Sequence, residues 1–262
     1  MKILFTTLWV EYLKTRKSKI FWATILFFLF VSSMMGLLMF VQIHPEISGK
    51  LGMIGNKASM LRFGEPNWEN YLTLLILGIS SVGLIGIGFV TSWVFGCEFS
   101  EHTVKDILAL PISRTSIVFS KFIVVVIWSI ILALIYFVTG LLIGLVIGLP
   151  GWSVVIAYQF AFKYFVTSLF ILLLSTPVAF LASYSRGYLV PLGFVILTLI
   201  LANFVGMVGL GPYFPWAIPG LYGTPDLTDD LQLNIASYII LICTFLVGLY
   251  GTIAFWRYAD QK

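Results

Sequence analysis

Six long apolar blocks constrain the fold of this sequence more than any other feature. A helix needs about 20 apolar residues to cross the hydrocarbon of a bilayer, and each block approaches that length without interruption. A transmembrane β-barrel would instead show short segments of alternating polarity, so we interpret the blocks as helices. They run over Ile20–Val41, Tyr71–Phe95, Phe122–Leu149, Phe160–Ser183, Leu189–Leu210 and Ile235–Trp256. The sequence therefore predicts an all-α polytopic membrane protein with six transmembrane helices, forming one domain over residues 1–262.

The scarcity of charge excludes a large soluble protein. Charged side chains make up 10% of the 262 residues, whereas soluble domains carry about 25%. A chain this poor in charge cannot cover a folded core with a polar surface, so most of its outer surface must face lipid. The first block is also too long for the apolar region of a signal peptide, and no A-x-A-like cleavage site follows it.

Lys and Arg residues are spread unevenly over the predicted loops. If the N-terminus is cytoplasmic, 11 of the 15 basic residues fall on the inner side and 4 on the outer side, as the positive-inside rule requires. Residues 211–234 fit the outer side because they include three aspartates and no Lys or Arg. We therefore expect a multi-pass protein of the plasma membrane with both termini in the cytoplasm.

Residues 1–19 show the pattern of an interfacial helix. Aromatic and apolar side chains recur there at helical spacing, at Phe5, Leu8, Trp9 and Tyr12. Charged side chains lie away from this stripe, at Lys2, Glu11 and Lys14. The positive-inside rule explains the charges but not the stripe. We therefore expect an amphipathic helix that lies among the lipid headgroups and leads into the first span.

The distribution of reactive side chains argues against several kinds of site. All eleven carboxylates lie in predicted loops, helix ends or tails, and both histidines lie outside the spans. An ionisable group inside the bilayer is costly and typically marks an ion path, so proton-coupled transport is not indicated. Cys97 and Cys243 form no metal pattern, and Gly49-Lys50 lacks the rest of a phosphate-binding loop. We expect no catalytic residue, metal or cofactor in this chain, and any energy for uphill transport must come from another chain.

Small and polar residues within the spans are candidates for helix contacts. Gly140, Gly144 and Gly148 recur every four residues in the third span, a spacing that lets helices approach closely in lipid. The partner helix could belong to the same chain or to a second copy. Asn203 in the fifth span and Lys163 near the outer end of the fourth are polar positions that could line a translocation path. An interhelical hydrogen bond or a side chain reaching the interface would also explain them.

Charge is concentrated in the stretch CEFSEHTVKDILALPISRTSIVFSK, residues 97–121, between the second and third spans. Its charged residues are Glu98, Glu101, Lys105, Asp106, Arg114 and Lys121. Thr103 and Asp106 fit a helix-capping pattern, Pro111 would end that helix, and Ser113 can cap the next one. This elbow is therefore either a handle for a cytosolic partner, built around a short helix, or an ordinary solvated loop.

The elbow resembles the signature Glu…Thr-x-x-x-x-Leu…Pro-x-Ser-Arg…Lys of ABC-2 type transporter permeases. The closest group is the six-span bacterial permeases associated with bacitracin and lantibiotic resistance. The likeness extends over nearly the whole chain, including residues 183–204 and the Pro- and aromatic-rich GPYFPWAIPGLYG after the fifth span. His102 departs from the family, which usually has Gly at that position, so the local backbone of the turn is the part that the likeness defines least.

The resemblance implies the permease half of an ATP-driven exporter. Two permease subunits, identical or paired paralogues, would associate with a cytosolic P-loop ATPase dimer that binds ATP and Mg, and no nucleic acid would be involved. The elbow would be the coupling helix that seats in the ATPase, and Gly211–Tyr222 would form short helices at the outer leaflet. The coupling residues that the resemblance implies are Glu98, Glu101, Thr103, Lys105, Asp106 and Arg114.

The apolar spans favour an amphipathic or hydrophobic substrate, such as an antimicrobial peptide, an antibiotic or a lipid-like compound. Two other classes of function remain open at this point. A membrane-embedded enzyme would need nucleophiles or metal ligands gathered at one depth, and none is visible in the sequence. A non-transporting assembly or interaction subunit would show the same spans and the same elbow.

Overall fold

The computed structural model describes residues 2–44, 64–101, 103–104, 112–224 and 228–258. These residues form helices and connecting turns, and no strand occurs among them. Six helical segments are long and apolar enough to cross a membrane. They are α2 (Lys19–Ile43), the segment Trp68–Ser100, α8 (Arg114–Ile147), α9 (Val154–Tyr184), α10 (Leu189–Met207) and α12 (Ile235–Tyr258). The predicted all-α polytopic fold with six spans is confirmed.

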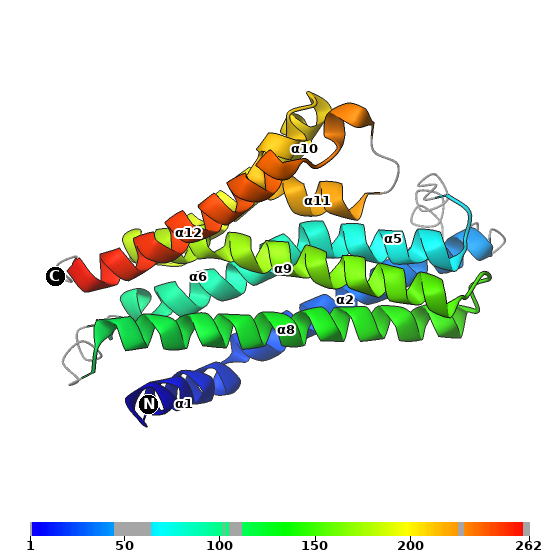
Figure 1. Ribbon diagram of the computed structural model, residues 1–262. Coiled ribbons are helices and arrows are strands. Elements are labelled where there is room, and N and C mark those ends of the chain that lie inside the picture. The colour runs from blue at the N-terminus through cyan, green and yellow to red at the C-terminus, as the bar shows by residue number, and fades with distance from the viewer. Residues whose placement is uncertain (1, 45–63, 102, 105–111, 225–227, 259–262) are drawn as a thin grey trace.

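The bundle brings both ends of the chain together (Figure 1). α1 (Lys2–Lys17), the C-terminal end of the segment Trp68–Ser100, the start of α8 and the C-terminal end of α12 all lie at one end of the molecule, and the connection from α8 to α9 lies at the other. α8 has 34 residues, which gives a length of about 50 Å. It is therefore longer than the roughly 30 Å hydrocarbon layer and begins at Arg114, well before the apolar block at Phe122.

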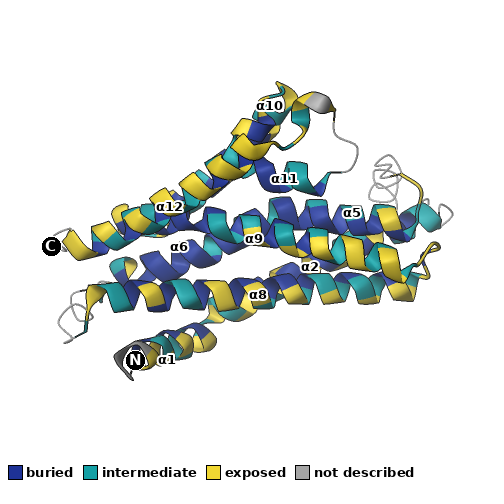
Figure 2. Ribbon diagram, viewed as in Figure 1, coloured by how far each residue is buried: buried dark blue, intermediate teal, exposed yellow. Residues whose placement is uncertain are grey.

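The second span occupies the middle of the bundle. It consists of α5 (Trp68–Gly78), a π-helical turn (Ile79–Gly83) and α6 (Leu84–Ser100). Its most apolar window is 67% buried, against 17% in α10 and 22% in α12, and α6 is dark blue along much of its length in Figure 2. α10 and α12 therefore leave most of their apolar surface for lipid or for another subunit.

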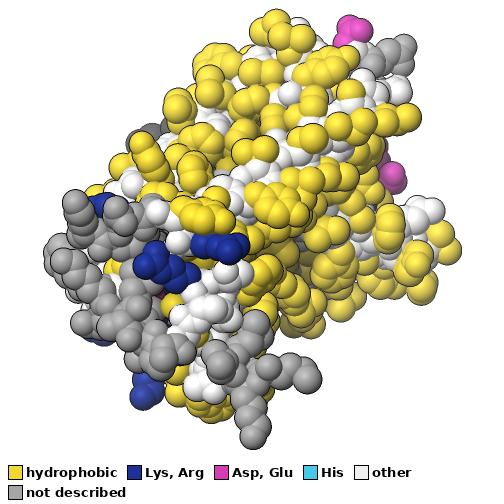
Figure 3. Space-filling model, turned by 60° about the vertical axis from the view of Figure 1, so that its left-hand side comes forward, with side chains coloured by type: hydrophobic (Ala, Val, Ile, Leu, Met, Phe, Trp, Pro, Cys, Tyr) yellow, Lys and Arg dark blue, Asp and Glu magenta, His cyan; other side chains and the backbone are white. Residues whose placement is uncertain are grey.

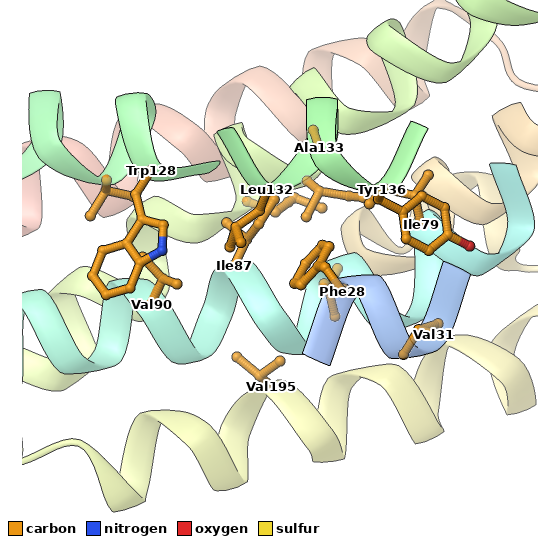
Figure 4. Packing of buried hydrophobic residues seen from close by; sticks show 14 of the residues in the cluster. Phe28, Val31, Ile79, Ile87, Val90, Trp128, Leu132, Ala133, Tyr136 and Val195 are labelled. Carbon is orange, nitrogen blue, oxygen red and sulfur yellow. The ribbon is translucent and has the colours of Figure 1, made fainter. Parts of the chain in front are cut away.

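Aromatic and aliphatic side chains fill the space around α6. Figure 4 shows Trp128 and Tyr136 of α8 together with Ile87 and Val90 of α6, and Phe28 of α2 lies beside them. The rings of Phe28 and Tyr136 meet edge to face at a centroid distance of 6.3 Å, a favourable aromatic arrangement. These contacts fix α2 and α8 on the second span.

Two of the three glycines grouped by their spacing in the third span face α5. A Cβ atom at Gly140 would lie 2.7 Å from the side chain of Leu75, and one at Gly144 would lie 2.7 Å from the ring of Trp68. Gly148 does not share this face. It caps α8 with φ +73° and has no neighbour within 4 Å of a Cβ position, so its role is the left-handed end of the helix. The close approach lies within the chain.

The segment between α10 and α12 folds into short helices, as the resemblance led us to expect. Two 3-10 turns, Gly211–Tyr213 and Pro215–Ala217, lead into α11 (Ile218–Gly223), which packs against α9 and α5. A third turn, Asp229–Leu231, precedes α12. Hydrophobic side chains cover much of the face in Figure 3, where the visible Lys and Arg gather toward one end of the molecule.

Candidate functional site

A cluster of charged side chains joins three helices at the end of the bundle that carries the elbow. α1 contributes Glu11 and Lys14, the last turn of α6 contributes Glu98, and α8 contributes Lys121. Glu98 and Lys121 are 1% and 0% exposed, and Glu11 is also buried. Because Glu98 lies at the start of the elbow and Lys121 is its last residue, the cluster closes the base of the elbow.

Lys121 is the centre of this cluster. Its Nζ donates hydrogen bonds to Oε1 of Glu98 at 2.6 Å and to the carbonyl oxygen of Val94 at 3.0 Å. It also forms an ion pair with Oε1 of Glu11 at 3.1 Å. Lys14 donates to the same Oε1 of Glu98 at 3.1 Å. Two bases thus face two acids, and the buried cluster has no net charge.

Aromatic rings and main-chain carbonyls extend the cluster. The Nζ atoms of Lys14 and Lys121 lie 6.0 and 5.9 Å from the ring centroids of Trp93 and Trp256, within reach of a cation–π attraction. Oε2 of Glu98 is buried and accepts no hydrogen bond from the described residues. Burial and the charge of Lys121 oppose the protonated form of Lys14, but the neighbouring Glu98, Cys97 and Glu11 together outweigh them and raise the pKa of Lys14.

The cluster determines how α1 lies on the bundle. Its polar face packs against α8, where Oγ1 of Thr7 lies 2.7 Å from Oγ of Ser120, and Glu11 reaches Lys121 beside it. The aromatic stripe points outward, since Phe5 is 68% and Trp9 54% exposed. The sequence pattern separates the charges from the stripe, but it does not indicate that the polar face is buried in the protein.

The structure separates the six predicted coupling residues. Glu98 lies inside the cluster, so its described contacts are within the chain, and it does not form an exposed handle. Glu101 is exposed at the end of α6, and the amide of Thr103 donates to the carbonyl of Glu98 at 3.0 Å. Lys105 and Asp106 lie outside the described residues, so the short helix expected there stays a prediction.

Arg114 connects the far side of the elbow to the last span. It is the first residue of α8, after the N-cap Ser113, whose Oγ accepts from the amide of Ser116 as the sequence predicted. The Nη1 atom of Arg114 donates to the main-chain oxygens of Trp256 and Arg257 at 3.4 Å each. A cation near the last carbonyls of a helix is stabilising, so Arg114 ties the start of α8 to the end of α12.

A second feature is a cavity of about 540 Å³ at the side of the bundle where α11 lies. Its walls come from the π-helical turn of the second span, from α10 and from the short helices that precede α12. Ser80, Ser81 and Asn203 bring polar groups to mainly apolar walls, and Nε1 of Trp216 is buried without a described acceptor. Lys163 is not among the lining residues and lies on α9.

The side chain of Asn203 has a partner inside its own helix. Its amide donates to the carbonyl of Leu199 at 2.9 Å. Ser80 and Ser81 likewise donate to the carbonyl of Leu77, at 2.8 and 3.0 Å. Among the described residues, no group of His, Cys, Asp and Glu could hold a metal ion.

A bundle of six helices that are long and apolar enough to cross a membrane, joined at one end to α1 by a charged cluster, defines a polytopic membrane protein. Comparison with known proteins identifies its family. The family model described as ABC-2 family transporter protein matches residues 7–204, about three quarters of the chain. The chain therefore belongs to the ABC-2 transporter family, whose permeases are transport subunits that work with an ABC ATPase.

One relative of this chain is the bacitracin transport permease protein BCRB of Bacillus licheniformis. The two sequences are 26% identical over 200 residues, which cover 76% of this chain and 94% of the relative. The predicted resemblance is thus confirmed at the level of the family. Lys121 belonged to the signature, although it was not among the proposed coupling residues. Glu11 and Lys14 gave no signal beyond their place on the polar face of α1.

Proposed function

We propose that this permease exports an amphipathic or hydrophobic compound, such as a membrane-active peptide, an antibiotic or a lipid-like molecule. The energy comes from ATP, bound with Mg²⁺ by a separate cytosolic P-loop ATPase dimer. Two permease subunits, identical or paired paralogues, complete the transporter. Both termini and the elbow of residues 97–121 face the cytoplasm. The observation that carries the coupling part of this proposal is the buried charged cluster at the base of the elbow.

The cluster gives the elbow a rigid attachment. Glu98 and Lys121 lie at the two ends of the elbow and form an ion pair at 2.6 Å, and each also forms an ion pair with α1. Breaking a buried ion pair by removing one partner costs about 3–5 kcal/mol. A push of the ATPase on the elbow therefore moves the ends of α6, α8 and α1 together, because separating them is more costly than displacing them as a unit.

The exposed residues of the elbow make the contact with the ATPase. Glu101 is exposed, and Lys105 and Asp106 follow it in the stretch that the resemblance assigns to the coupling helix. Glu98 acts indirectly, by holding the base of this stretch. Exposed charge pairs are worth roughly 0–1 kcal/mol each, so several of them are needed to seat the ATPase.

The cavity between the second span and α10 supports the proposed class of substrate. Its volume lies in the range of about 300–1,000 Å³ that is usual for small-molecule sites. The described part of the lining is apolar except for neutral hydroxyl, amide and indole groups, and no Asp, Glu, Lys or Arg is among these residues. Such walls suit a compound with an apolar body and a few uncharged polar groups. The adjacent π-helical turn is a feature often found at functional sites.

A resistance assay tests the proposal. The permease is expressed with its ATPase in a sensitive host, and tolerance to a panel of membrane-active peptides and lipid-targeting antibiotics is measured. We expect higher tolerance to at least one member of the panel, and loss of that tolerance when the ATPase cannot hydrolyse ATP. Tolerance that persists without hydrolysis, or ATPase binding without any change in tolerance, would instead favour a non-transporting interaction subunit.

A further inference from the structure

An apolar groove of about 400 Å³ lies beside α1, away from the charged cluster and from the cavity next to α10. Its walls are the aromatic stripe of α1, the first turns of α2 and the middle of α8. Each helix contributes an exposed side chain to the wall: Trp9 of α1, Trp22 of α2 and Ile127 of α8 are 54%, 63% and 44% exposed. The groove is therefore open to its surroundings along the side of the bundle.

Aromatic rings that pack at steep angles to one another support the groove. The ring of Phe21 lies 5.4 Å from that of Trp128, which in turn lies 5.8 Å from Trp93. The indole nitrogen of Trp128 donates to Oγ1 of Thr24 at 3.1 Å, so this ring is held firmly. Trp93 also faces Lys14, which places the groove one layer of side chains away from the charged cluster.

One end of the groove is basic. Thr15 and Arg16 are its polar lining residues, and both belong to the last turns of α1. Arg16 is exposed and forms no ion pair with a described residue. Lys17 and Lys19 are exposed too, but they lie outside the groove lining. The groove thus combines a long apolar wall with a cationic end, which is the pattern of an acyl chain with an anionic headgroup.

We propose that this groove is a binding site for one anionic phospholipid of the membrane leaflet in which α1 lies. An acyl chain lies along the aromatic wall formed by α1, α2 and α8, and the phosphate contacts Arg16. Occupancy of the groove holds α1 against the bundle from its apolar side, while the charged cluster holds it from its polar side. The proposal assumes the cytoplasmic orientation given above, since anionic lipids are enriched in the inner leaflet.

The test compares two lipids on the full-length chain purified in detergent. A ligand that binds only the folded protein raises its midpoint of thermal unfolding. We expect dioleoylphosphatidylglycerol to raise the midpoint more than dioleoylphosphatidylcholine does. Arg16→Glu should remove most of this difference, whereas Lys19→Glu, the same charge change outside the groove lining, should preserve it. Equal effects of the two lipids, or equal losses in both variants, would show only diffuse attraction and would overturn the proposal.

A second pair of variants tests the apolar wall. Ile127→Trp fills the groove from α8, while Ile130→Trp places the same side chain at an exposed position of α8 outside the lining. We expect the first variant to lose the selective effect of phosphatidylglycerol and the second to retain it. If a variant cannot be purified, quenching of wild-type tryptophan fluorescence by brominated phosphatidylglycerol tests whether the lipid binds in the groove. Quenching that is saturable and resists excess phosphatidylcholine supports the site, and non-saturable quenching contradicts it.

Discussion

Neutralising Glu98 should destabilise the protein more than a single exposed charge could, and removing Lys121 as well should restore most of the loss. Glu98→Gln keeps the shape of the side chain but removes the negative charge that lies 2.6 Å from the fully buried ammonium of Lys121. At an effective dielectric constant of 20, that contact corresponds to a gross attraction of about 6 kcal/mol. Relaxation and the remaining contact to Glu11 reduce the net cost, so we expect a loss of about 3–5 kcal/mol.

The double variant separates pairing from packing. Lys121→Met alone leaves two buried carboxylates facing Lys14, so it should also cost about 3–5 kcal/mol. Glu98→Gln combined with Lys121→Met leaves Glu11 opposite Lys14, one charge of each sign. Replacing a buried ion pair by neutral groups of similar volume is often close to neutral in stability. We therefore expect the double variant to lose much less stability than the sum of the two single losses.

The assay is equilibrium unfolding of the purified permease in mixed detergent micelles, with the coupling energy taken from the double-mutant cycle. A matched control is Glu101→Gln, because Glu101 is exposed three residues further along the chain, and its effect should stay within about 0.5 kcal/mol. Additive losses for Glu98→Gln and Lys121→Met would refute the reasoning, since residues that stabilise the fold independently show no coupling. The ATPase activity of the assembled complex measures the effect of the same variants on function.

Four further outcomes are expected. Cysteine labelling from outside the cell should reach a probe at position 48 or 229 but not at Lys105, and labelling at Lys105 would reverse the proposed orientation. Reversing the charges of Glu101 and Asp106 together should preserve insertion but abolish ATPase binding or coupled hydrolysis, whereas normal transport would reduce the elbow to a solvated loop. Gly144→Leu should disrupt the packing of α8 against α5 and destabilise the protein, whereas Gly193→Leu, at a site with open space, should not. The pKa of Lys14 is raised in the folded state. The difference in unfolding free energy between wild type and Lys14→Met should therefore be constant from about pH 6 to 9 and shrink only as the pH rises through that pKa. A difference that is lost near neutral pH would contradict this.

The spans could be predicted from sequence because the bilayer imposes its own length and polarity on them. Each predicted block overlaps a helix of the structure, and the main disagreements are at helix ends, such as α8 beginning at Arg114. Helix caps that have a local sequence signature can also be predicted, as the N-cap Ser113 shows. Gly148 was assigned to a packing face although Leu149, Pro150 and Gly151 follow it, a sequence that is typical of a helix end.

The charged cluster could not be predicted in the same way. Glu11 and Lys14 lie on the polar face of α1, and a polar face that contacts water has the same sequence pattern as one that contacts buried charges. Their partners Glu98 and Lys121 are distant in sequence, and no local rule indicates that an acid at the end of one span pairs with a base on the next. The π-helical turn of Ile79–Gly83 likewise has no sequence pattern that distinguishes it from the α-helix on either side.

The arrangement of these contacts suggests how movement at the elbow reaches the cavity. α6 and α8 are joined through Glu98 and Lys121, and Arg114 joins the start of α8 to the end of α12. α10 is the least buried span. It supplies one wall of the cavity, and the second span supplies the opposite wall. If the elbow displaces α6 and α8 as a unit, the wall that follows them moves relative to α10, so the cavity changes shape without any rearrangement inside the charged cluster. Strengthening the contact between α10 and the second span, for example by a disulfide across the cavity, should therefore stop transport while ATPase binding continues.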